Sequence, residues 1–234
     1  MTGASSAECL TWKQNSRNAI HNGLMWGYDF FETILRKQGY SVIAGVDEVG
    51  RGSLAGPVVA AAVILECGGD FSDIRDSKVL SARSRDKVAG RIRREAIAIG
   101  VGAVGETEID RINILQATKR AMIQAVSRLP IRPEMVLVDG FWLAGLTVPC
   151  MGIVQGDSRS YSIAAASIVA KVQRDKLMTA FAGNFPHYGF ERNKGYGSTF
   201  HRQAIAEHGP CPIHRRSFGG VREFVAIGGD NGGR

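Results

Sequence analysis

Short apolar runs rich in β-branched residues recur along the chain, and this pattern predicts the strands of a sheet. Three of them cover residues 42–47, 58–65 and 97–104, a fourth covers 135–139, and a fifth ends near Val154. The loop between the first two runs is Gly-rich and too short for a crossover helix, so we expect these strands to pair antiparallel. Because the last two strands are reached through helices, the pattern predicts an α/β sheet of mixed direction.

Helical spacing of apolar residues marks the segments between these strands. Ser81 is a suitable N-cap for a helix in which Val88 and Ile92 are one turn apart. One helix is predicted from residue 108 to residue 129, where prolines follow. An Ala/Ser-rich helix after Asp157 has one face small enough to lie close on a sheet.

The two ends of the chain differ from its middle. Residues 1–24 are polar and unpatterned, which predicts a disordered segment before a docking helix that ends near Gly39. We therefore expect one α/β domain over 25–218, with a small helical C-terminal part that includes a helix near 200–208, followed by a tail at 219–234.

Composition narrows the class of protein. Lys and Arg number 29 against 22 Asp and Glu, a net charge of +7, and 44% of the 234 residues are hydrophobic. Such a chain can bury a core, which excludes disorder and coiled coil, and its basic surface favours a polyanionic partner. The four cysteines form no Cys-x-x-Cys pair, and no signal peptide or membrane span is recognisable. We therefore expect a cytoplasmic protein.

One group of residues could hold zinc. His208, Cys211 and His214 are close enough in sequence to reach a common metal ion. A fourth ligand is missing, however, and prolines flank the cysteine, so the pattern argues against a structural zinc site.

Four acidic residues stand at the ends of the apolar runs. The first strand ends in the acidic pair Asp47 and Glu48, Asp139 ends the fourth, and Asp157 follows the fifth. An isolated Asp-Glu pair is usually a solvated turn, but four carboxylates at one edge of a sheet form an oxygen site suited to Mg²⁺. In a basic protein, such a site indicates phosphoryl transfer chemistry.

Seven segments of this chain resemble ribonuclease HII, the type 2 ribonuclease H, in the same order from Gly45 to Phe218. They are GVDEVGRGSLAGPVVAAAVIL (45–65), DSKVLS (76–81), NILQAT (113–118), VLVDG (136–140), GDSRSYSIAAASIVAKVQRD (156–175), NKGYGST (193–199) and GPCPIHRRSF (209–218). The resemblance implies a ribonuclease H-like fold, a mixed five-stranded sheet flanked by helices. It also implies a monomer that acts on RNA/DNA hybrids and on DNA duplexes containing ribonucleotides.

The resemblance further implies the reaction and its residues. The expected reaction is hydrolysis of the RNA strand and cutting 5′ of single ribonucleotides in duplex DNA, by two Mg²⁺ or Mn²⁺ ions, leaving 3′-hydroxyl and 5′-phosphate ends. The implied catalytic and metal-binding residues are the four acids already selected. Gly50, Arg51 and Gly52 are expected to meet the 2′-hydroxyl at the RNA-to-DNA junction, and Tyr196 the neighbouring sugar. Tyr196 also has an alternative role as a packing residue.

Lys78 and Asn113 lie in segments that match the family and are weaker candidates for substrate contact, as is Thr118; each also has a surface or capping explanation. Two positions depart from the pattern of the family. Gln155 stands where many members have Lys, which removes a positive charge beside Asp157, and Ser53 stands where Pro is frequent.

Two rival functions remain at this stage. A nucleic-acid-binding protein without catalysis would use the basic surface alone, but clustered carboxylates without metal would repel phosphates. A metal-dependent nuclease or phosphatase acting on DNA or on small phosphate esters would share the four acids. Only the resemblance carried by Gly50–Gly52 favours a substrate that contains RNA.

Overall fold

A computed structural model describes residues 28–74 and 81–225 of the chain. The segment 1–24, which is predicted to be disordered, lies outside the described residues, as do Lys78 and the end of the predicted tail. No helix in the described ranges is long and apolar enough to cross a membrane.

The core is a five-stranded mixed sheet with the strand order β3-β2-β1-β4-β5. The strands are β1 (Ile43–Val49), β2 (Val58–Ile64), β3 (Ala98–Val104), β4 (Met135–Asp139) and β5 (Cys150–Ile153). β2 pairs antiparallel with both β1 and β3, while β4 pairs parallel with both β1 and β5. The predicted mixed α/β sheet is therefore confirmed. β1 ends two residues later than predicted, because Val49 still pairs with Val59, so the acidic pair lies inside the strand.

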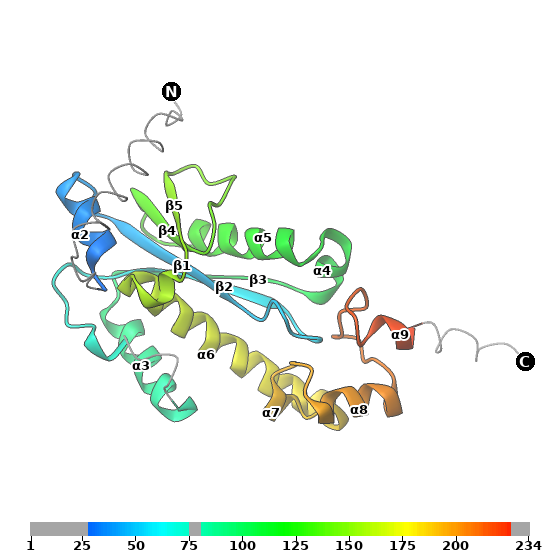
Figure 1. Cartoon of the computed structure of the whole chain (residues 1–234). Helices are drawn as coiled ribbons and strands as arrows, with labels where there is room; N and C mark the ends of the chain where they lie inside the picture. The colour runs from blue at the N-terminus through cyan, green and yellow to red at the C-terminus, as the bar shows by residue number, and fades with distance from the viewer. Residues whose placement is uncertain (1–27, 75–80, 226–234) are drawn as a thin grey trace, which may run out of the picture.

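Helices cover both faces of this sheet (Figure 1). They are α2 (Phe30–Lys37), α3 (Ala82–Glu95), α4 (Glu106–Ile112), α5 (Ile114–Ser127), α6 (Tyr161–Asn184), α7 (Phe190–Asn193), α8 (Thr199–His208) and α9 (Arg222–Val225). Strand alternation divides the core between the faces. Ala60 and Ala62 of β2 belong to the cluster beneath α5, whereas Ala61 and Val63 pack with α3 and α6. The predicted N-cap of α3 is confirmed, since the Ser84 amide donates to Ser81 Oγ at 3.2 Å.

The predicted helix over 108–129 is wrong as a single element, because it is broken at Asn113. This residue has a φ of 67° and ends α4, and its Oδ1 accepts a hydrogen bond from the Gln116 amide at 3.1 Å. Asn tolerates the left-handed conformation and caps helices well, so one residue supplies both the turn and the new N-terminus. The apolar residues of α4 and α5 follow nearly the same helical spacing, so the sequence pattern does not reveal the break between them.

The central helix α6 lies unusually close to β1. A Cβ atom on Gly45 would be 2.1 Å from the carbonyl carbon of Ser162, so a side chain at this position would push the helix off the sheet. The N-terminus of α6 is also fixed to α2, because buried Glu32 accepts hydrogen bonds from Ser160 Oγ (2.6 Å) and the Ser162 amide (3.1 Å). The acids of β1 therefore face a rigidly placed helix.

A separate apolar cluster joins the C-terminal part to the loop after β1. Leu54 and Ala55 of that loop pack with residues of α6, α8 and the last described segment, including Met178, Ile205 and Val221. The C-terminal part is therefore attached to the loop that holds the residues predicted to recognise substrate.

Candidate active site

Three of the four predicted acids, Asp47, Glu48 and Asp139, meet at the C-terminal ends of β1 and β4. β1 and β4 are parallel and Val46 pairs with Val138, so the residues that follow them, Asp47 and Asp139, are neighbours. The Gly156 amide donates to Asp139 Oδ1 at 2.6 Å, which ties the turn after β5 to the end of β4. Asp157 is the next residue of that turn, a 3₁₀ segment (Gly156–Ser158) that contacts β4.

Asp47 is the most buried of these carboxyls, with only 6% of its surface exposed. Its pKa is raised well above the ordinary value, first by burial and then by the negative charges of Glu48 and Asp139. Hydrogen bonds from the Glu48 amide (2.7 Å) and from Ser167 on α6 act in the opposite direction. Ser167 was not predicted, because nothing in the sequence distinguishes it from the other serines of that helix.

One carboxylate oxygen of Glu48 lacks a hydrogen-bond partner among the described residues. Its Oε1 is 3.2 Å from Arg51 Nη1, whereas Oε2 is buried and has no hydrogen-bond partner. Burial raises the pKa of Glu48, and the nearby Arg51 opposes this rise without cancelling it. An unpartnered carboxylate oxygen beside two further carboxyls is an environment that a hard divalent cation would stabilise.

The oxygens of these carboxyl groups are not arranged around one common position. Nowhere in the described ranges do three or more His, Cys, Asp or Glu side chains form a ready-made metal site. The side chains must therefore rotate to place these oxygens around one ion. This is expected, because the like charges of the carboxylates repel each other when no cation lies between them.

The peptide groups of the loop after β1 have a fixed orientation. Arg215 is fully buried and donates to the carbonyls of Gly50 (2.6 Å) and Arg51 (2.8 Å). All peptide bonds of the described residues are trans, so the N–H of each peptide unit points opposite to its carbonyl. The amides of Arg51 and Gly52 therefore point away from Arg215, on an exposed part of the loop. Gly50 has a φ of +93°, and a Cβ there would lie 2.1 Å from Arg174 Nε, so only glycine fits.

Arg174 supports the same loop from α6. It is also fully buried, and it donates to the carbonyls of Pro57 (2.9 Å), Ala55 (3.1 Å) and Lys194 (2.8 Å). Within the described ranges neither Arg174 nor Arg215 forms an ion pair with a carboxylate. Burial and then the charge of Arg174 lower the pKa of Arg215 to about 9. Sequence reasoning missed Arg174, although an arginine in an Ala-rich apolar helix is a signal that could have identified it.

Tyr196 lies beside this loop and remains accessible. The carbonyl of its neighbour Gly195 accepts a hydrogen bond from the Leu54 amide at 2.8 Å, which joins the two loops. The Tyr196 ring is 5.4 Å from the Arg174 guanidinium and 5.7 Å from Lys171 Nζ, and 37% of the residue is exposed. A ring between two cations and solvent is placed to contact a polyanion.

The weaker candidates have structural roles. Asn113 caps α5, as described above, and Thr118 is completely buried in α5, which is incompatible with contact to a phosphate. Asp175, in the matching segment 156–175, pairs with Lys171 at 2.8 Å, one helical turn away. Gln155 has a left-handed φ of 54° and is exposed immediately before the turn that carries Asp157.

The three candidate zinc ligands are not assembled. Cys211 and His214 are buried and in contact, with the Sγ to Nδ1 distance at 3.1 Å. His208 instead stacks on His187, with the ring centres 4.5 Å apart.

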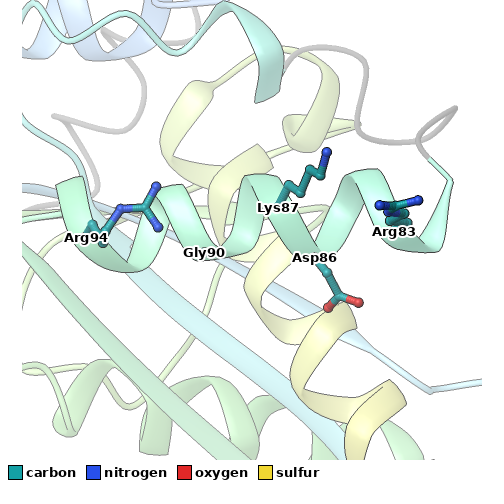
Figure 2. A pocket seen from close by; sticks show the side chains of 5 residues that line it. All are labelled: Arg83, Asp86, Lys87, Gly90 and Arg94. Carbon is teal, nitrogen blue, oxygen red and sulfur yellow. The ribbon is translucent and has the colours of Figure 1, made fainter.

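The strongly basic helix α3 lies on the same side of the sheet as α6. A shallow depression along α3 is lined by Arg83, Asp86, Lys87, Gly90 and Arg94 (Figure 2). Figure 2 shows Lys87 and Asp86 projecting from opposite sides of this helix. The depression is open and mostly cationic, which suits an extended anion better than an enclosed small molecule.

Comparison with known proteins identifies the family of this chain. The chain matches the sequence profile of ribonuclease HII over residues 44–221. It is 55% identical over 195 residues to the ribonuclease HII of Geotalea daltonii, a match that covers 83% of this chain and 90% of that relative. The fold is similar to that of the ribonuclease H2 from Pyrococcus horikoshii, with a TM-score of 0.66, 24% identity, and coverage of 80% of this chain and 98% of that one.

A more distant fold similarity involves a metal-bound structure. Bst-RNase HIII in complex with Mn²⁺ has a TM-score of 0.60 to this chain and 18% identity, and the match covers 82% of this chain and 71% of that one. The sequence resemblance and the predicted five-stranded fold are both confirmed. The chain belongs to the ribonuclease HII family and is a type 2 ribonuclease H, a hydrolase of the RNA strand of RNA/DNA hybrids.

Proposed function

We propose that this ribonuclease also cuts on the 5′ side of single ribonucleotides embedded in duplex DNA, and that it uses two divalent ions. The observation that carries the proposal is that two features lie next to each other in the chain. A buried group of carboxyls with an unpartnered Glu48 oxygen lies directly before an exposed loop whose amides point outward. The first feature suits phosphodiester hydrolysis, and the second suits recognition of a hydroxyl beside it.

The four acids Asp47, Glu48, Asp139 and Asp157 would hold Mg²⁺ or Mn²⁺. The orphaned Oε2 of Glu48 and the raised pKa of Asp47 support this assignment, because the first is a buried oxygen without a hydrogen-bond partner in the described part of the chain and the second reflects burial beside other carboxylates. The Mn²⁺ complex of Bst-RNase HIII shows that a protein with this fold binds such an ion. When bound, two divalent ions activate a water and stabilise the leaving oxygen of a phosphodiester.

The chain itself positions the substrate. Arg215 holds the carbonyls of Gly50 and Arg51 inward, so that the next two amides can donate to an oxygen of the ribose or phosphate. Tyr196 would pack against the adjacent sugar, and the cations along α3 would contact the phosphate backbone at longer range. Because the 2′-hydroxyl distinguishes RNA from DNA, the donors at Gly50–Gly52 would set the substrate class.

The direct test uses a labelled DNA duplex that contains one ribonucleotide. We expect cutting on its 5′ side in Mg²⁺ or Mn²⁺, full loss of cutting in a chelator, and recovery when the metal is restored. The products should carry 3′-hydroxyl and 5′-phosphate ends, because an external water is the nucleophile. The matched all-DNA duplex should remain intact. A 2′,3′-cyclic phosphate end, or cutting of the all-DNA duplex, would contradict the proposal.

Tyr196→Ala should reduce cleavage at a single ribonucleotide more than cleavage within a continuous RNA strand. A continuous strand offers alternative registers, whereas a lone ribonucleotide must be bound in one position. Comparing kcat/KM on the two substrates measures the difference. The control is Phe200→Ala, which removes another exposed ring in the same region and should affect both substrates little. Equal losses on both substrates for Tyr196→Ala would make Tyr196 a packing residue.

A further inference from the structure

Two buried histidines lie next to one another beneath the Tyr196 turn. His201 on α8 is fully buried and His214 in the C-terminal segment is 1% exposed, and their Nε2 atoms are 3.0 Å apart. His201 Nδ1 is in turn 2.9 Å from the main-chain carbonyl oxygen of Tyr196. The catalytic proposal assigns no role to either histidine. Together they form a continuous polar connection from the C-terminal segment to the turn that carries Tyr196.

The groups that contact the two histidines determine which ring nitrogens donate a hydrogen and which accept one. The Cys211 amide donates to His214 Nδ1 at 2.9 Å, and an amide N–H can only donate, so this nitrogen bears the lone pair. In a neutral ring the hydrogen of His214 is then on Nε2, where it is donated to His201 Nε2. His201 must therefore carry its own hydrogen on Nδ1, and it donates that hydrogen to the Tyr196 carbonyl.

The reverse direction fails at its last contact. If His201 Nε2 were the donor to His214, the neutral His201 would present a lone pair from Nδ1 to the lone pairs of the Tyr196 carbonyl. His214 would then carry its hydrogen on Nδ1, where it would face the Cys211 N–H at 2.9 Å, although Cys211 Sγ (3.1 Å) and the Cys211 carbonyl (3.3 Å) could accept from it. Only the first direction satisfies all three short contacts.

The surroundings keep both rings neutral. Burial lowers the pKa of His201 and lowers that of His214 to about 4. The rings of Tyr188 and Phe190 pack against both histidines, with Tyr188 4.9 Å and Phe190 5.8 Å from His214. A proton added to His201 Nε2 would face the N–H of His214, so charging the pair would break the connection.

We infer that His201 and His214 are positioning residues that fix the Tyr196 turn through a one-directional hydrogen-bond chain, Cys211 amide to His214 to His201 to the Tyr196 carbonyl. This inference rests on the proposed role of Tyr196 in binding the ribonucleotide. The turn is otherwise closed by its own main chain, with the Tyr196 amide donating to the Asn193 carbonyl at 2.9 Å and the Ser198 amide donating to the Tyr196 carbonyl at 2.8 Å. The histidine chain supports the turn from below and leaves the ring of Tyr196 accessible.

The first test measures the two tautomers directly in the unmodified full chain. Nitrogen-15 NMR of the imidazole groups should show a hydrogen on Nδ1 of His201 and on Nε2 of His214, both neutral at pH 7. Assignment uses the spectra of the single variants described next. The opposite tautomers, or a charged ring, would overturn the inference whatever the role of Tyr196.

The second test uses two variants that each keep one end of the His201 ring. His201→Asn places an amide near the position of Nδ1 and keeps a donor for the Tyr196 carbonyl, whereas His201→Gln places it near Nε2 and loses that donor. We expect His201→Asn to cut the single-ribonucleotide duplex within about threefold of the unmodified protein. His201→Gln should lose about three- to tenfold in kcat/KM, the loss expected from one main-chain hydrogen bond. Denaturation midpoints check that both variants are folded.

The third test asks whether the effect acts through Tyr196. Adding His201→Gln to Tyr196→Ala should cause no further loss on this substrate, because the ring that the turn positions is already absent. His208→Asn, at a partly exposed histidine of the same helix, is the matched control and should change nothing. Equal losses for His201→Asn and His201→Gln, or an additive loss in the double variant, would overturn the inference. If Tyr196→Ala alone has no effect, the proposed function of Tyr196 fails, while the tautomers remain separately tested by NMR.

Discussion

Asp47→Asn is expected to reduce cleavage by several orders of magnitude and at the same time to stabilise the folded protein. The side chain is buried beside Glu48 and Asp139, so its charge is unfavourable for folding unless a cation balances it. An amide of the same shape keeps the packing and removes the repulsion, but it is a poor ligand for Mg²⁺. Removing buried like-charge repulsion should raise the free energy of unfolding in the absence of metal by about 0.5–2 kcal/mol.

The gain in stability should depend on pH with a definite sign. The pKa of Asp47 is higher in the folded than in the unfolded protein, so the folded state holds the proton more tightly. Below the unfolded pKa both states are protonated and the residue has no cost. As pH rises through the folded pKa, the cost develops in full. The stabilisation by Asp47→Asn should thus be greatest at neutral pH and should shrink in acid.

Binding and chemistry can be separated in the same variant. Affinity for the hybrid comes mainly from Lys and Arg contacts to phosphates, so Asp47→Asn should retain salt-sensitive binding. Asp29→Asn, at an exposed carboxylate where α2 begins, is the matched control and should change neither activity nor stability. Near-normal turnover of Asp47→Asn would show that the acids are assigned to the wrong site.

Arg215→Met should cause the largest loss of stability of any single substitution considered. The guanidinium satisfies the carbonyls of Gly50, Arg51 and Gly56, and methionine has no donor for any of them. Each buried carbonyl left without a partner costs about 1–3 kcal/mol. Removing a desolvated cation next to Arg174 offsets part of this, so we expect a net loss of about 3–5 kcal/mol, a large fraction of the total for a typical domain.

Urea denaturation measures this loss, and cleavage assays under conditions where the variant is folded measure its effect on the loop. The amides of Arg51 and Gly52 should lose their fixed outward orientation, so activity on a single ribonucleotide should fall as well. Arg216→Met removes an exposed arginine at the next position and should leave stability within about 0.5 kcal/mol of the unmodified protein. A similar small change for Arg215→Met would show that the buried guanidinium does not hold the loop.

Local pattern was sufficient to predict the sheet and the acids. Each strand is a short β-branched run whose period of two places alternate residues on opposite faces, and this property is fixed by neighbours in sequence. The acids were recognisable because each interrupts or ends such a run, and parallel strands place their ends together. Motif order then identified the family, since the matching segments run through most of the chain.

Tertiary structure alone decided which polar residues serve the site. Arg215 reaches Gly50 across 165 positions of sequence, and His201 and His214 become partners only when α8 folds against the C-terminal segment. No local periodicity encodes such contacts, because the partners are far apart in the sequence and meet only in the folded chain. Thr118 illustrates the converse: it lies in a matching motif, and the packing of α5 on the sheet buries it away from any substrate. Sequence thus determined the strands and the acids that we propose to bind metal, while long-range burial determined how the loop after β1 is held.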